Sequence, residues 1–189
     1  MRVSREQAAL NRERVLDAAA RLYREHGFGG IGVADLMKAA GLTHGGFYGQ
    51  FESKEDLMAQ ACERAFERSA DNWRQAVEHG GGDPLKALAT AYLSTAHRDH
   101  PGQGCVVASV GAEAARQGPA VRGAITAGVK SLVNLLASWM PERTEAVRHR
   151  KSLAAFSTMV GALVLSRAVD DAAFSEEILQ ASLDAVRKG

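Results

Sequence analysis

Residues 33–51 read VADLMKAAGLTHGGFYGQF, and this stretch decides how the rest of the chain is interpreted. Two short helical segments flank Gly41, and a glycine permits the positive φ that a sharp turn between helices needs. We predict helices over 33–40 and 44–51, with Thr43 as the N-cap of the second. This is the layout of a helix-turn-helix, although a generic pair of helices around a glycine has the same spacing.

The composition favours helices along the whole chain. The 189 residues include 34 alanines, against 24 valines, isoleucines and threonines together. Alanine has the highest helix propensity and β-branched residues favour strands, so a β-sandwich, a barrel and a parallel-sheet enzyme are excluded. The sequence therefore predicts an all-α protein with a substantial core.

Capping residues and prolines mark where the helices begin and end. Ser4 opens a capping box, Ser53 precedes an acidic first turn, and Asp83–Pro84 fits an N-cap followed by a first helical residue. The prolines further along cut the C-terminal two thirds into helix-sized pieces. The nine predicted helices cover about 4–25, 33–40, 44–51, 53–79, 84–98, 103–116, 119–139, 143–169 and 174–187.

Several classes of protein and site are excluded. The charge-free stretch 152–166 has only 15 residues, fewer than the roughly 20 of a membrane span, and the N-terminus lacks the apolar run of a signal peptide. Two cysteines make no disulfide framework, so we expect a reducing cytoplasm. His97 and His100 lack a third ligand nearby, and no catalytic motif occurs. We therefore predict no enzyme, no cofactor and no metal site.

The flanks of the central stretch match a known pattern in order and spacing. The matching segments are RVLDAA at 14–19, YREHGF at 23–28, AAGLT at 39–43, Phe47–Tyr48, Phe51 and SKEDL at 53–57. Over residues 10–60 the chain closely resembles the TetR/AcrR family of bacterial transcriptional regulators. The resemblance implies a helix-turn-helix DNA-binding domain over 1–52 and a ligand-binding and dimerisation domain over 53–189.

The resemblance also assigns roles at the DNA. It implies that Thr43, Tyr48 and Lys54 bind phosphates, in keeping with the preference of helix N-termini for anions. Tyr48 as half-buried packing and Lys54 as a solvated charge are the alternatives. The formal net charge of +1 predicts no polyanion partner by itself, so DNA binding rests on placed residues. The residues expected to face the groove are His44, Gly45, Gly46 and Gln50.

The central stretch departs from the family pattern at several positions. His44 stands where the family usually has lysine, Gly32 where it often has threonine, and Met37 where it usually has alanine. Three glycines, at 45, 46 and 49, each cost about 1 kcal/mol in a helix relative to alanine. We expect a soft recognition helix that either orders on DNA or lets its backbone approach the bases closely.

The middle helices carry the candidates for an effector pocket. These candidates are mostly apolar side chains at helical spacing, a pattern that is also typical of an ordinary packed core. Cys105 follows Gly102–Gln103–Gly104 at a predicted helix start, a position that favours the reactive thiolate of a sensor, while a buried inert thiol is the simpler alternative. The ligand candidates are Trp73, Tyr92, Cys105, Val106, Ile125, Val129, Leu132 and Trp139.

The last two long helices are expected to form a dimer bundle as well as core. The candidate dimer residues are Phe156, Val160, Leu163 and Val164. The sequence thus indicates a homodimeric transcription factor, a repressor that leaves a palindromic DNA operator when a small-molecule effector moves the helix starting at Lys54. The alternative is a helical small-molecule binding protein with a degenerate DNA-binding end.

Overall fold

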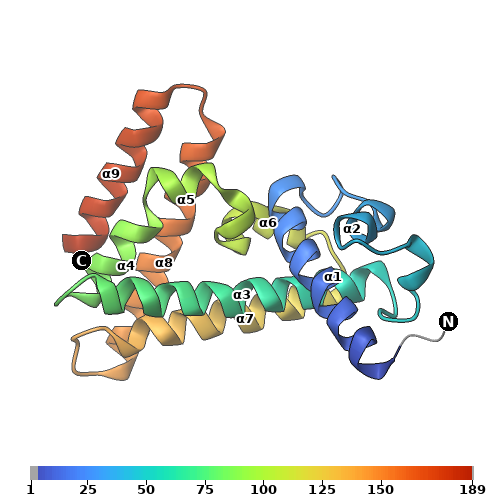
Figure 1. Ribbon diagram of the computed structural model, residues 1–189. Coiled ribbons are helices and arrows are strands. Elements are labelled where there is room, and N and C mark those ends of the chain that lie inside the picture. Colours follow the sequence, from blue (N-terminus) through green and yellow to red (C-terminus); the bar gives the residue numbers. More distant parts are fainter. Residues whose placement is uncertain (1–3, 189) are drawn as a thin grey trace.

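A computed structural model describes residues 4–188 of the chain. Within that range it has nine α-helices, two 3-10 turns and no strand, which confirms the all-α prediction (Figure 1). Residues 1–3 of the first predicted domain and residue 189 of the second lie outside the described residues. The elements are α1 (Arg5–His26), α2 (Val33–Ala39), η1 (His44–Gly46), α3 (Lys54–His79), α4 (Pro84–Tyr92), α5 (Thr95–Asp99), η2 (Pro101–Gln103), α6 (Val106–Ala114), α7 (Pro119–Ser138), α8 (Glu145–Ala168) and α9 (Ala172–Lys188).

Local capping explains why several helices begin where the sequence predicts. The Ser4 hydroxyl accepts a hydrogen bond from the Gln7 backbone N–H at 3.1 Å, and the Ser53 hydroxyl accepts one from the Asp56 N–H at 3.0 Å. Pro84 is the first residue of α4. These contacts satisfy backbone donors that have no partner inside the helix.

Two predicted helices are interrupted. The prediction of one helix over 84–98 is wrong, because α4 ends at Tyr92 and α5 starts at Thr95. The Ser94 hydroxyl accepts from the His97 N–H at 3.1 Å, so a side-chain cap restarts the helix without a proline or glycine at the break. The helix expected over 103–116 is likewise shorter, since η2 and a loop precede α6.

The long helix α3 connects the two ends of the molecule. It lies alongside α7 for much of its length, with α1 and α2 at its N-terminal end and α8 and α9 toward the other (Figure 1). A Cβ added to Gly128 of α7 would lie 2.1 Å from the Phe66 ring, so the two helices approach more closely than any side chain at 128 would permit. None of the helices within 4–188 is long and apolar enough to cross a membrane.

Candidate nucleic-acid interface and ligand pocket

The N-terminal end holds a tight turn between α2 and η1. Gly41 has a φ of +72°, as its place in the sequence predicts, and the Leu42 N–H donates to the Met37 carbonyl at 2.8 Å to close the end of α2. Phe47 and Phe51 are buried, and their rings stack 5.6 Å apart. This apolar contact holds the segment after the turn against the rest of the N-terminal end.

The second element of this motif is shorter than predicted. The helix expected over 44–51 is a single 3-10 turn, η1, followed by further turns. Its bonds run from the Gly46 N–H to the Thr43 carbonyl and from the Phe47 N–H to the His44 carbonyl, each 3.1 Å long. Three glycines within six residues lower the helix propensity enough for the tighter turn to prevail.

The residues expected to bind DNA fall into an exposed group and an inward-facing group. Tyr48 is 74% exposed, which contradicts its alternative as half-buried packing. Thr43, His44 and Gly45 are exposed and Gly46 is half-buried. Thr43 is the N-cap residue of η1, as predicted, but within the described chain its side chain makes no capping hydrogen bond. The hydroxyls of Thr43 and Tyr48 therefore lie on the surface together with the His44 ring.

Lys54 and Gln50 turn toward the protein. The Lys54 ammonium donates to the carbonyls of Phe28 and Ile31, at 3.0 and 3.3 Å, and so ties the start of α3 to the loop after α1. The ammonium has three N–H donors, so one is left for a phosphate, and the alternative of a fully solvated charge is wrong. The Gln50 amide nitrogen donates to the Gly46 carbonyl at 3.3 Å, a contact inside the turn itself.

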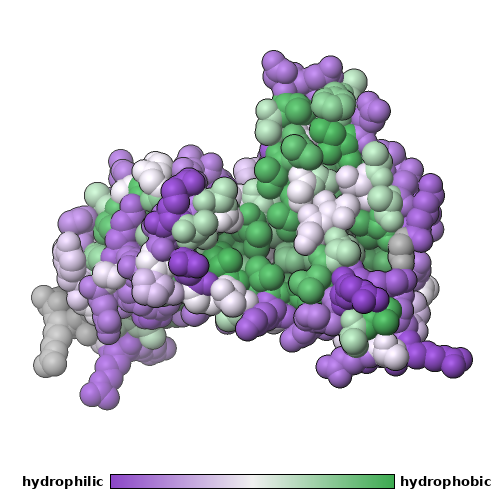
Figure 2. All heavy atoms as spheres, turned by 180° about the vertical axis from the view of Figure 1, so that it is seen from behind, coloured by the Kyte–Doolittle hydropathy of each residue, from purple (hydrophilic) through white to green (hydrophobic). Residues whose placement is uncertain are grey.

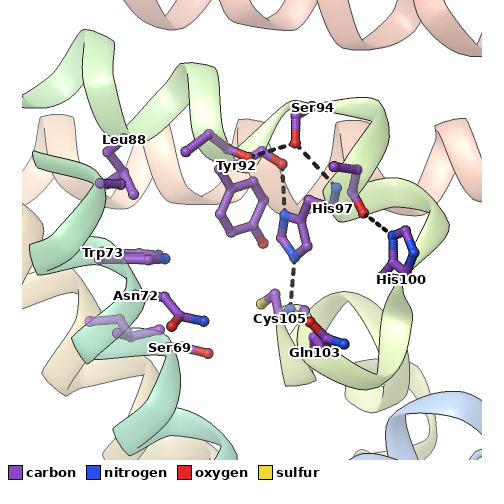
Figure 3. Close-up of a pocket in the computed structure, with 15 residues that line it drawn as sticks. Ser69, Asn72, Trp73, Leu88, Tyr92, Ser94, His97, His100, Gln103 and Cys105 are labelled. Atoms are coloured by element: carbon purple, nitrogen blue, oxygen red, sulfur yellow. Dashed lines mark hydrogen bonds between the residues drawn. The ribbon is translucent and has the colours of Figure 1, made fainter. Parts of the chain in front are cut away.

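A cavity of about 430 Å³ lies between α3 and the segment from α4 to the start of α6. Of the four predicted ligand residues that line it, three lie between α3 and the start of α6: Trp73, Tyr92 and Cys105. In Figure 3 the side chains of Trp73, Asn72 and Ser69 come from one side of the cavity and face Tyr92 and Cys105 on the other.

The other ligand candidates separate into different parts of the fold. Leu132 also lines the cavity, while Val106 is buried core. Ile125 and Val129 pack half-buried against the core and are not among the lining residues. Trp139 lines a different cavity of about 580 Å³ near the α7–α8 connection. Helical spacing selects residues on the inner face of α7 but does not distinguish cavity wall from packed core.

His97 organises the wall of the cavity. Its Nδ1 donates to the Tyr92 carbonyl at 2.7 Å, and its Nε2 accepts from the Cys105 backbone N–H at 2.9 Å (Figure 3). Burial, the Arg167 charge and the Arg24 charge lower the pKa of His97 from its ordinary value of 6.5, against an opposing effect of the Tyr92 carbonyl. From the sequence alone, we consider this ring only as a metal ligand and reject that role; its backbone partners are not visible in the sequence.

Two polar contacts join the cavity side of the molecule to the N-terminal end. The guanidinium of Arg24 in α1 is buried and donates to the Gly104 carbonyl at 2.8 Å, and burial lowers its pKa to about 10. The Glu113 carboxylate of α6 accepts from the Phe28 N–H at 2.9 Å. Sequence reasoning missed Arg24, and the signal available was a charged residue directly beside the apolar stripe of α1.

The predicted dimer residues divide between core and surface. Phe156 and Leu163 are buried within the protomer, and the Phe156 ring lies 5.5 Å from that of Trp73 with its edge toward it. Their assignment as dimer contacts is corrected to core. Val160 is half-buried, and Val164 is 42% exposed. Four large apolar side chains are exposed on α8 and α9: Leu153, Val164, Leu165 and Phe174. Figure 2 shows apolar surface on the part of the molecule that projects upward in that view and in the recess below it.

The chain matches one family of known proteins at its N-terminal end. Residues 15–61 match the model of the bacterial regulatory proteins of the tetR family. The chain is 30% identical to the transcriptional regulator AcrR of Shigella flexneri over 87 residues, which are 46% of this chain and 40% of AcrR. It is 27% identical to the transcriptional repressor NemR of Escherichia coli over 128 residues, 66% of this chain and 64% of NemR. The chain thus covers less than two thirds of either relative.

The similarity in fold extends further than the similarity in sequence. The crystal structure of reduced E. coli NemR superposes with a TM-score of 0.77 over 94% of this chain and 95% of that one, at 22% identity. A TetR regulator from Chloroflexus aurantiacus gives 0.76 over 97% of both chains at 24% identity. The segment of residues 15–61, which contains the helix-turn-helix, is that of the tetR family of bacterial regulatory proteins, and the fold of the whole chain is the one that these solved structures share.

Proposed function

We propose that this protein is a homodimeric transcriptional repressor that acts in the cytoplasm and leaves its palindromic operator when a small molecule enters the cavity beside α3. The observation that carries the proposal is the exposed group of Thr43, His44 and Tyr48 on a buried aromatic support, inside the segment that matches the family. A helix-turn-helix presents such a surface to the major groove.

Each exposed residue has a role that suits its chemistry. The Thr43 and Tyr48 hydroxyls would donate to phosphate oxygens, and such contacts fix the position of the protein on the duplex. His44 and the backbone of Gly45 would approach the base edges. Lys54 would join them through its third N–H donor, and Gln50 would join them after exchanging its internal hydrogen bond for a DNA contact, which gives the free protein a different arrangement from the bound one.

A two-fold dimer would present two such surfaces to one face of the duplex, about 34–36 Å apart. The exposed apolar side chains of α8 and α9 support this part of the proposal, because a symmetric dimer buries the same patch on both protomers. We assign Leu165 and Phe174, which are 57% and 49% exposed, to this dimer interface together with Val164. Val160 would lie at its edge.

Release would follow from movement at the wall of the cavity. An effector against His97 and Cys105 would displace the neighbouring Gly104, whose carbonyl binds Arg24 of α1. The same effector would press on Trp73 of α3, the helix that begins at Lys54. Both routes end at the N-terminal surface, and a change in the separation of the two surfaces would weaken operator binding.

Binding to selected duplexes tests the proposal. We expect the purified protein to sediment as a dimer and to enrich a palindromic sequence from a random duplex library, with an affinity that falls steeply as salt rises. Tyr48→Phe removes one hydroxyl and keeps the exposed ring, so a change in the affinity for the enriched duplex reports on that hydroxyl alone. A protein that binds small molecules in the cavity and ignores every duplex at low ionic strength would instead be the binding protein with a degenerate DNA-binding end.

A further inference from the structure

The cavity beside α3 is walled by apolar and uncharged polar side chains. Trp73, Leu88 and Leu132 supply much of the apolar wall, and Ser69, Asn72 and Gln103 bring hydroxyl and amide groups. Within residues 4–188, no aspartate, glutamate, lysine or arginine is among the lining residues. A ligand with a full charge would therefore lose its hydration without gaining a counter-ion, which costs several kcal/mol.

His97, in the wall of the cavity, does not supply that counter-ion. His97 donates through Nδ1 and accepts through Nε2, so its hydrogen bonds require the neutral ring. His100 binds the Ala96 carbonyl through Nδ1 at 2.8 Å and is exposed at the mouth of the cavity. Only the outer nitrogen of His100 is open to a ligand.

Two guanidinium groups stand behind the wall, and both are already bound to the protein. Arg24 donates to the carbonyls of Ala20 and Gly104, and Arg167 donates to those of His97 and Arg98. Their charges act on the cavity without direct contact. They disfavour a cationic ligand and favour one with a partial negative charge on an oxygen.

Tyr92 supplies a hydrogen-bond donor that the protein does not use. Its side chain is 3% exposed, and within the described chain its hydroxyl has no hydrogen-bond partner of normal geometry. The group beside it is the Cys105 thiol, a weak acceptor, and the hydroxyl points toward the side of the cavity that Cys105 and Gln103 line (Figure 3). Burial keeps the phenol protonated by raising the pKa of Tyr92 well above its ordinary value. A buried donor without an acceptor is costly, so an acceptor on the ligand would relieve that cost.

We propose that the cavity takes an uncharged aromatic compound with a hydrogen-bond-accepting oxygen, and that the Tyr92 hydroxyl donates to this oxygen while Trp73 packs against the ring. This inference rests on the proposed function in that it names the class of effector for the same site. It assigns Tyr92 as the residue that selects for the oxygen.

Four probes with one ring system separate the possibilities. 2-Acetylnaphthalene carries a neutral acceptor, 2-ethylnaphthalene lacks it, 2-naphthoate is anionic and 2-naphthylmethylammonium is cationic. Calorimetry with the ligand in the cell measures each dissociation constant on the DNA-free protein. We expect the acetyl compound to bind about threefold to tenfold more tightly than the ethyl compound, and both ions to bind at least about tenfold more weakly than the acetyl compound.

Two tyrosine variants assign the effect to one hydroxyl. Tyr92→Phe is expected to bring the acetyl and ethyl compounds to equal affinity. Tyr23→Phe is the matched control, because Tyr23 is also buried with an unpartnered hydroxyl but lies outside this cavity. It should retain the full preference for the acetyl compound.

The results distinguish failure of the ligand class from failure of the proposed function. Tighter binding of either ion, no binding of any probe, or a preference for the acetyl compound that survives Tyr92→Phe would each overturn the inference. If the acetyl compound binds as expected and the protein ignores all duplexes, the inference stands and the repressor proposal fails. If the protein binds an operator and also binds the naphthoate more tightly than the acetyl compound, the repressor proposal stands and the inference fails.

Discussion

Replacing Gly128 of α7 by alanine is expected to destabilise the protein, because α3 leaves no room for a side chain there. A Cβ at 128 would lie 2.1 Å from Cδ2 and 2.3 Å from Cγ of Phe66, whereas carbon atoms in contact prefer separations of about 3.5–4.0 Å. Phe66 is 5% exposed, and the clashing atoms include the root of its ring. The ring cannot rotate away from such a contact, so α3 or α7 has to shift.

The magnitude follows from two opposing effects. Overpacking a buried contact costs about 1–3 kcal/mol, and alanine in place of glycine inside a helix gains about 1 kcal/mol. Gly123→Ala supplies the matched control, because Gly123 lies in the same helix and a Cβ there meets no atom within 4 Å. Both variants gain the same helix propensity. The difference between them, about 1–3 kcal/mol, therefore isolates the clash.

Thermal unfolding followed by calorimetry measures this difference at a fixed protomer concentration, because dimer formation would make the melting temperature concentration-dependent. For a chain of this size the Gly128→Ala protein should melt about 2–12 °C below the Gly123→Ala protein. Adding Phe66→Leu should remove part of the cost of Gly128→Ala, a coupling that a double-mutant cycle detects. Equal melting temperatures for the two alanine variants would refute the close approach of α3 and α7.

Three further changes probe the N-terminal surface and the cavity wall. Tyr48→Phe should weaken operator binding about tenfold in a fluorescence-anisotropy titration; unchanged affinity would remove Tyr48 from the interface. Gly45→Ala combined with Gly49→Ala adds Cβ atoms where no atom lies closer than 3.9 Å. Because alanine favours the helix, we expect operator binding to become up to about 30-fold tighter. Weaker operator binding would indicate that the backbone approaches the bases. The folded protein keeps His97 neutral while the unfolded chain protonates it, so the stability that is present above pH 6.5 should be lost as the pH falls. Urea unfolding at pH 7.5 and pH 5.5 measures this loss as a fall in the midpoint. The fall should be smaller in His97→Gln than in the unchanged protein.

Signals that act within a few residues predicted the fold well. The positive φ of Gly41, the Ser53 cap of α3 and Pro84 at the start of α4 each depend on neighbours in sequence, and each is present. The 3-10 turn at 44–46 depends on a balance instead. Its three glycines weaken the helix, but helix propensity alone does not give the extent of the tighter turn, which ends at the buried Phe47.

The wall of the cavity could not be predicted in this way. The Arg24 bond to Gly104 spans 80 positions, and the Arg167 bond to the His97 carbonyl spans 70. Such contacts require the tertiary arrangement: a charged residue beside an apolar stripe can indicate burial, but nothing in the sequence identifies its partner. The same holds for Phe156, since an apolar stripe does not show which part of it faces the protomer core.

In the proposed mechanism, one contact has enough energy to link the cavity to the DNA-binding end. The Arg24 guanidinium is buried, so losing the Gly104 carbonyl would leave a charged donor partly unpaired, at a cost of about 1.5–3 kcal/mol. Allosteric coupling typically amounts to about 1–3 kcal/mol, a 5- to 150-fold change in affinity. Gly104 is followed by Cys105, whose N–H is held by His97 in the cavity wall. A ligand that moves this wall would therefore either carry α1 with it or break the bond, and in both cases the position of the N-terminal surface relative to the cavity would change.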